Sequence, residues 1–182
     1  MTVADLPVAS LPTRAAEPLH VPQHRALRAA LRDFYDDYAL ALDDLDLEGW
    51  VDFFVEDCHY RVIPRENVDA GLPLGLIYCM SKDMLRDRVT ALRQTTVFEP
   101  RSLRHFIGPV RVREITGSRI RAEANFAIVE SLSDREPTLN LVGTYVDELE
   151  HAGHGADLGF ALVRRDCVVD NYRIRNSLIV PV

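Results

Sequence analysis

The side chains best suited to acid–base chemistry lie in a short stretch around residue 58 and in one histidine further along the chain. Asp57 and His59 are two residues apart, so on a strand they share a face and the carboxylate could orient the imidazole. His105, with Tyr60, could complete an acid–base site. The alternative for a buried histidine is a bond to a carboxylate or carbonyl, a common way to satisfy a polar core group. Both interpretations stay open from the sequence.

The spacing of cysteine and histidine does not favour a metal centre. A Rieske cluster needs two Cys and two His in paired short spacings, whereas Cys58, Cys79 and Cys167 are far apart. Cys58 and His59 are adjacent and point to opposite faces of a strand. Mononuclear non-haem iron needs two His and one carboxylate, which His59, His105 and Asp57 could supply only by long-range convergence. We therefore expect no metal-binding, cofactor-binding or catalytic residue in this chain.

Length and composition indicate one soluble domain. The chain has 182 residues and a formal net charge of −7, which argues against nucleic acid as a partner. Residues 1–22 are rich in Pro and Ala and predict a flexible arm before a domain at 23–182. No apolar run is long enough to span a bilayer. The three scattered cysteines predict buried thiols without disulfides, which fits the cytoplasm.

Three helices are predicted in the first half of the chain. Apolar residues recur every three or four positions from Gln23 onward, which indicates a long helix with one buried face. Asp46 can cap a second, short helix that ends near Asp57 and buries Trp50. A strand at 58–63 and a loop at 64–76 follow, and Ser81 begins the third helix.

After Pro100 the apolar period changes from 3.6 to 2, which predicts consecutive antiparallel strands. Helices followed by strands indicate an α+β fold with the helices laid across one face of a strongly bent sheet. This outline resembles the cystatin-like cone fold shared by nuclear transport factor 2 and ketosteroid isomerase. One face of the predicted strands carries Ile120, Ala122, Ala124, Phe126 and Ile128, then Leu139, Leu141, Gly143 and Tyr145.

Charges are separated along the sequence. Residues 33–57 contain ten acids and no base, whereas residues 82–113 contain eight bases and three acids. The separation predicts a polarised surface, formed by solvated helix faces or by complementary contacts between subunits. The candidate interface residues are Arg86, Arg88, Arg93, Arg101 and Arg104.

A resemblance to a known family rests on several motifs in order. They are Trp50–Val62, Glu66-Asn67, Gly71–Leu74, Met84–Arg93, Glu99-Pro100 and Arg104-His105. In their order and spacing these segments resemble the β subunits of bacterial aromatic-ring-hydroxylating dioxygenases over approximately residues 24–182. The resemblance implies a non-catalytic subunit that forms a trimer and supports three α subunits in an α3β3 hexamer.

The same resemblance places the chemistry in other chains. It implies an α subunit that holds a Rieske [2Fe-2S] cluster, a mononuclear non-haem Fe(II) and the substrate, with NADH or NADPH electrons arriving through a reductase and in some systems a ferredoxin. The Cys58–Val62 and Met84–Arg88 segments are most similar to subunits that act on aromatic carboxylates such as salicylate, terephthalate or aminobenzoate. The rival hypotheses are a free-standing isomerase, dehydratase or hydrolase that uses Asp57, His59 and His105, and a small-molecule or protein-binding module.

We predict that the purified chain alone contains no stoichiometric iron, labile sulfide or zinc, because paired Cys and His spacings are absent from the sequence. Elemental analysis and a visible absorption spectrum measure this directly. One bound iron per chain that is lost on both His59→Ala and His105→Ala would reverse the assignment.

Overall fold

The computed structural model describes residues 23–152, 159–174 and 178–182, so the arm predicted for residues 1–22 lies outside the described residues. Its helices are α1 (Gln23–Asp43), α2 (Leu47–Asp52), α3 (Arg65–Asp69) and α4 (Lys82–Gln94). Its strands are β1 (Phe54–Pro64), β2 (Ile77–Cys79), β3 (Arg101–Ile107), β4 (Arg111–Thr116), β5 (Arg119–Leu132), β6 (Thr138–Ala152) and β7 (Gly159–Val169). The described chain is therefore an α+β structure.

The helices begin and end where local side chains satisfy the backbone. The Asp46 carboxylate accepts from the Gly49 amide at the start of α2, and Ser81 accepts from the Met84 amide at the start of α4. The helix α1 ends at Asp43, since Leu45 has a positive φ of 57°. Helices lie at the three predicted places, α1, α2 and α4, but α2 ends at Asp52 instead of near Asp57, because β1 begins at Phe54. The segment 64–76 is not all loop, however, because it contains the short helix α3.

The strands form one mixed sheet in the order β2-β1-β7-β6-β5-β3, with β4 also paired to β5. Neighbouring strands run antiparallel except β1 and β7, which are parallel. The antiparallel run predicted after Pro100 is thus confirmed. Neither the strand β2 nor the parallel return of β7 to β1 was predicted.

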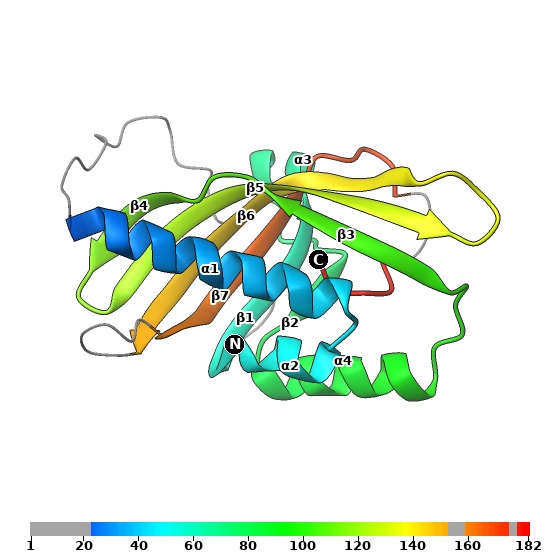
Figure 1. Cartoon of the computed structure of the whole chain (residues 1–182), viewed down its shortest axis with the longest axis horizontal. Helices are drawn as coiled ribbons and strands as arrows, with labels where there is room; N and C mark the ends of the chain where they lie inside the picture. The colour runs from blue at the N-terminus through cyan, green and yellow to red at the C-terminus, as the bar shows by residue number, and fades with distance from the viewer. Residues whose placement is uncertain (1–22, 153–158, 175–177) are drawn as a thin grey trace.

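One face of this sheet packs on α1 and is called the inner face. Figure 1 shows α1 lying across the strands, with α2 and α4 beside one end. The predicted alternation is confirmed for β5, whose inner residues Ile120, Ala122, Ala124, Phe126 and Ile128 are all buried. Leu139 is 55% exposed, contrary to its predicted place beside Leu141. The cause is a register shift between Ile128 and Val129, which turns Leu139 to the other face.

Trp50 lies in the core, as predicted from its helical face. Its side chain is fully buried, and its ring makes edge contacts with Phe54 and Tyr60 at centroid distances of 5.4 Å. These contacts join α2 to β1 on the inner side of the sheet. The indole therefore contributes to stability through packing.

A salt bridge lies at the centre of this apolar core. The Arg165 guanidinium donates twice to the Asp147 carboxylate, over 2.9 and 2.7 Å, and both side chains are fully shielded from solvent. Tyr35 of α1 donates a hydrogen bond to the same carboxylate. The guanidinium carbon lies 4.0 Å from the ring centroid of Tyr38 and 4.2 Å from that of Tyr145. The pair thus joins β6, β7 and α1.

We expect Trp50→Ala to lower the free energy of unfolding by about 3 to 5 kcal/mol, because it removes a large side chain from a filled core. Urea denaturation followed by circular dichroism measures the change. Val97→Ala is the control, since Val97 is 99% exposed. An unchanged midpoint for Trp50→Ala would show that the indole does not support the core.

We expect Asp147→Ala to lower the free energy of unfolding by about 3 to 5 kcal/mol, because it leaves the Arg165 charge buried without a partner. The double variant Asp147→Leu with Arg165→Met should lose much less, since no charge stays behind. Chemical denaturation of both variants tests this. The interpretation fails if the double variant is the less stable of the two.

Candidate functional site

The inner face gathers the polar groups that could form a functional site. Burial alone would lower the pKa of Arg165, but the Asp147 carboxylate, together with the neighbouring tyrosines Tyr38 and Tyr35, holds that pKa well above its usual range. Burial raises the pKa values of Tyr35 and Tyr145, with a further contribution from neighbouring groups. The site therefore contains one ion pair and neutral phenols at neutral pH.

The segment 178–182 covers this part of the inner face. Val180 and Val182 are buried, at 5% and 1% exposure. Tyr60 holds Val182 on both sides: its hydroxyl donates to the main-chain oxygen over 3.2 Å and accepts from the amide over 2.8 Å. Arg88 of α4 donates to the oxygen of Leu178 over 2.9 Å. The chain's own residues thus occupy the space above the sheet.

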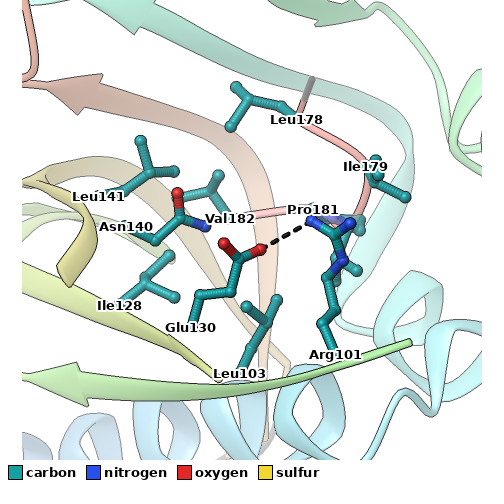
Figure 2. Close-up of a pocket in the computed structure, with 11 residues that line it drawn as sticks. Arg101, Leu103, Ile128, Glu130, Asn140, Leu141, Leu178, Ile179, Pro181 and Val182 are labelled. Carbon is teal, nitrogen blue, oxygen red and sulfur yellow. Dashed lines mark hydrogen bonds and ion pairs between the residues drawn. The ribbon is translucent and has the colours of Figure 1, made fainter. Parts of the chain in front are cut away.

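Little empty space is left beside this segment. Figure 2 shows a cavity between the segment and strands β3, β5 and β6, with the Arg101–Glu130 ion pair among its lining side chains. Its volume of about 20 Å³ has room for about one water molecule. Sites for organic ligands usually measure several hundred Å³. This cavity is therefore too small for an aromatic substrate.

A wider groove lies between α2 and α4, on the outside of the molecule. Its volume is about 450 Å³, and its polar lining includes Glu48, Asp52, Arg86 and Arg93. The charged groups in it are paired, as Arg93 with Glu48 at 2.9 Å and Arg86 with Glu56 at 3.0 Å. Exposed, paired charges do not supply the buried acid and base that catalysis requires.

The structure does not bring the three acid–base candidates together. Asp57 is exposed and shares the outer side of β1 with His59, which is half-buried and pairs in register with Arg164. His105 is buried on β3 and faces inward between Leu103 and Ile107. The sheet therefore separates His59 from His105.

His105 has a structural partner that the sequence did not suggest. Its Nδ1 lies 2.7 Å from Asp43 Oδ1, and its backbone amide donates to the same carboxylate over 3.0 Å. Asp43 is the last residue of α1, so this contact joins the end of α1 to β3. The histidine thus follows the alternative of a buried imidazole bonded to a carboxylate.

Three further sequence-based expectations concern cysteines, metal ligands and membranes. Cys58, Cys79 and Cys167 are free and buried, and burial raises the pKa of Cys58 to about 11. The thiols are therefore protonated at neutral pH and poor nucleophiles.

Within residues 23–152, 159–174 and 178–182, no three His, Cys, Asp or Glu side chains gather as a metal site would require. In the same ranges no helix is long and apolar enough to cross a membrane.

The five arginines proposed for an interface have different surroundings. Arg93 pairs with Glu48 across the α2–α4 groove, and Arg86 pairs with Glu56 of β1. Arg101 pairs with Glu130, and Arg88 donates to main-chain oxygens. The acidic first helices and the basic later segment thus partly neutralise each other within the chain. Arg104 is exposed on β3 and donates a hydrogen bond to the carbonyl oxygen of Leu103 over 2.6 Å.

The sequence reasoning missed the Arg165–Asp147 pair. Arg165 faces inward, whereas Arg164 bonds to Asp166 on the other face of the sheet. The signal that could have found this pair is the alternation of inward-facing and outward-facing residues along β6 and β7. Asp147 follows Tyr145 by two residues on the inner side of β6 and lies opposite Arg165 in register. Opposite charges at facing inner positions indicate a buried ion pair.

Comparison of the sequence with known proteins finds relatives in one class. The chain is 33% identical over 141 residues to the anthranilate 1,2-dioxygenase small subunit of Burkholderia cepacia, covering 78% of this chain and 85% of the relative. It is 32% identical over 111 residues to a β subunit of the terminal oxygenase component of a Comamonas terephthalate 1,2-dioxygenase, covering 61% and 72%. Both relatives are small subunits of dioxygenases.

Solved structures agree with the sequence comparison. A chain assigned as the β subunit of an aromatic-ring-hydroxylating dioxygenase from Novosphingobium aromaticivorans has 38% identity and a TM-score of 0.79, covering 88% of this chain and 99% of that chain. A protein of that organism assigned as a scytalone dehydratase shares the fold alone, with 16% identity and a TM-score of 0.60 over 88% and 93%. The family model described as the ring hydroxylating β subunit matches residues 38–176. The chain therefore belongs to the family of ring-hydroxylating β subunits.

Proposed function

We propose that this chain is the small, non-catalytic subunit of a ring-hydroxylating dioxygenase that acts on an aromatic carboxylate. The family match over residues 38–176 supports the subunit assignment. The substrate class is supported by relatives whose names specify anthranilate and terephthalate, which both carry a ring carboxylate. Its work is to position and stabilise the larger α subunit.

The observation that carries this proposal is the filled inner face. An acid–base enzyme of this shape needs an open pocket with convergent titratable groups. In this chain that space holds the Arg165–Asp147 pair and the segment 178–182, and a cavity of about 20 Å³ remains beside them. A rigid, filled core suits a subunit whose outer surfaces make the functional contacts.

The proposal assigns the redox chemistry to partner chains. The described residues do not supply the ligand set for a Rieske cluster or a mononuclear iron, since no suitable group of His, Cys, Asp or Glu gathers among them. The [2Fe-2S] cluster and Fe(II) then belong to the α subunit. Electrons from NADH or NADPH reach that subunit through a separate reductase, with or without a ferredoxin, in the cytoplasm.

We place the assembly contacts on the outer face of β3, β5 and β6. Across these strands Arg104 pairs in register with Val129, and Val129 pairs with Leu139. Phe106 is two residues from Arg104 along β3. Phe106 is 61% exposed and Leu139 55%. An exposed aromatic ring and a leucine beside an arginine form the kind of patch that protein interfaces use. In the proposed α3β3 hexamer this patch contacts a neighbouring subunit.

The nuclear transport factor 2-like cone is the fold class that we assign to this subunit. Fold likeness to a scytalone dehydratase supports it, as does a bent sheet with α1 laid across it. The rival of a free-standing dehydratase or isomerase needs Asp57, His59 and His105 in one site, but neither cavity described above includes any of them. A small-molecule-binding module would likewise need an open site.

We expect native mass spectrometry to find a trimer of this chain alone and an α3β3 hexamer when the α subunit is co-expressed. Arg104→Glu should weaken the hexamer by roughly 2 kcal/mol or more, because it reverses a charge at the contact. Arg135→Glu is the matched control, since Arg135 is exposed and pairs with its neighbour Asp134. Hydroxylation of the ring should be lost in parallel with the hexamer.

One set of results would overturn the proposed function. A chain that stays monomeric, does not bind the α subunit and converts a small substrate unaided, with loss of turnover on His105→Ala, would replace this proposal with the free-standing enzyme.

A further inference from the structure

The exposed side of α1 carries negative charge around one leucine. Its residues are spaced four, three and four positions apart, which places them on one side of a helix: Asp33, Asp37, Leu40 and Asp44. All four are exposed, and Leu40 is 57% exposed. The Asp44 amide donates to the Leu40 oxygen over 2.9 Å, so the helical turn continues to Asp44. We call these four residues the acidic stripe.

The carboxylates of the acidic stripe are not balanced within the described chain. Two other acids of α1 are paired, since Asp36 lies 2.7 Å from Arg32 and Asp43 lies 2.7 Å from His105. The three carboxylates of the stripe make no ion pair among the residues that the structure describes. Their charge is therefore available to a second molecule.

Positive charge flanks an exposed aromatic ring on the other side of the sheet. We call this surface the outer patch, and it comprises the residues proposed for assembly and one arginine of β4: Arg104, Phe106, Val129, Leu139 and Arg111. Arg111 is exposed and faces outward, because its register partner Glu123 lies between the buried inner residues Ala122 and Ala124. The Glu123 carboxylate is bound to Arg113 instead. Neither arginine of the outer patch pairs with a carboxylate within the described ranges.

The spacings along the two surfaces agree. Along α1, aspartates lie about 6 Å to one side of Leu40 and about 10 Å to the other, at a rise of about 1.5 Å per residue. Along β3 and β4, arginines lie about 7 Å to one side of Phe106 and about 13 Å to the other, at about 3.3 Å per residue. The second strand distance follows from the register partners Ala127 and Glu123, which are four residues apart on β5. Leu40 can therefore meet Phe106 while an ion pair forms at each end.

The two surfaces cannot meet within one chain, because the sheet lies between them. Figure 1 shows α1 lying across the strands on the inner face, whereas the outer patch is on the opposite face of β3, β4, β5 and β6. A contact between them therefore joins two copies head to tail. Such contacts generate a closed ring when the rotation between copies permits it.

We propose that the acidic stripe of one copy binds the outer patch of the next copy, and that this contact builds a trimer of the chain. Leu40 and Phe106 form its apolar centre, with the pairs Asp44–Arg104 and Asp33–Arg111 at its rim. The partner is thus a second copy of this chain. The inference rests on the proposed function, since it names the occupant of the patch that assembly uses.

A disulfide cross-link tests which residues meet. Mild oxidation of the full chain with Leu40→Cys and Phe106→Cys should yield covalent dimers and trimers on a denaturing gel without reductant. Either single variant should stay unlinked, because in a head-to-tail contact residue 40 does not meet its own equivalent. Leu74→Cys in place of Phe106→Cys is the matched control, since Leu74 is 66% exposed on another loop. The native cysteines are buried and free.

Charge exchange tests the rim. Asp44→Arg and Arg104→Glu should each raise the concentration at which the trimer half-dissociates by at least about tenfold, because each brings like charges together. The double exchange should return that concentration to within about threefold of the unchanged chain, because opposite charges meet again. Asp69→Arg, at an exposed position of α3, is the matched control. Analytical ultracentrifugation measures the assembly, and circular dichroism establishes that each variant is folded.

The outcomes separate this contact from the proposed function. A folded double-cysteine variant that does not cross-link, or a trimer that Asp44→Arg leaves unchanged, overturns the contact. If that variant still forms an active hexamer with the α subunit, the subunit assignment stands and the outer patch binds the α subunit instead. If Asp44→Arg does not fold, the cross-link decides alone.

Discussion

The salt bridge between Arg165 and Asp147 is the interaction that constrains the rest of the molecule. Both charges are inside the core, where an unpaired charge is strongly unfavourable, so β6 and β7 must keep the register that places them opposite each other. Tyr35 donates to the carboxylate, and the Tyr38 ring covers the guanidinium. Because both tyrosines belong to α1, the pair also fixes how the long helix lies on the sheet.

This polar centre fills the interior that an active site in this fold would need. Fold relatives include a protein assigned as a dehydratase, which has the same architecture at 16% identity. In this chain the corresponding interior is occupied by a charge pair, by phenol rings and by residues 178–182. The interior of this chain then contributes stability rather than an open site.

The sequence predicted what depends on local pattern. Periodicity identified α1, α2, α4 and the antiparallel strands, and capping residues such as Asp46 and Ser81 fixed two helix starts. The features it missed depend on distant partners. The strand β2 is three residues long and exists because β1 pairs with it, and Leu139 turns outward because of one register shift. The sequence shows Glu48 in an acidic stretch and Arg93 in a basic one. It does not show that folding brings the Arg93 guanidinium within 2.9 Å of the Glu48 carboxylate.

The parallel pairing of β1 with β7 also has a consequence for the order of folding. Arg61 and Asp166, which bond across these strands, are 105 residues apart in the sequence. Contacts of such separation form late, because a long loop must close before they become favourable. During synthesis β1 therefore emerges long before β7 and has only the short β2 to pair with. Until the seventh strand has left the ribosome, the edge and apolar side chains of β1 lack their partner, and such an edge can pair with other chains.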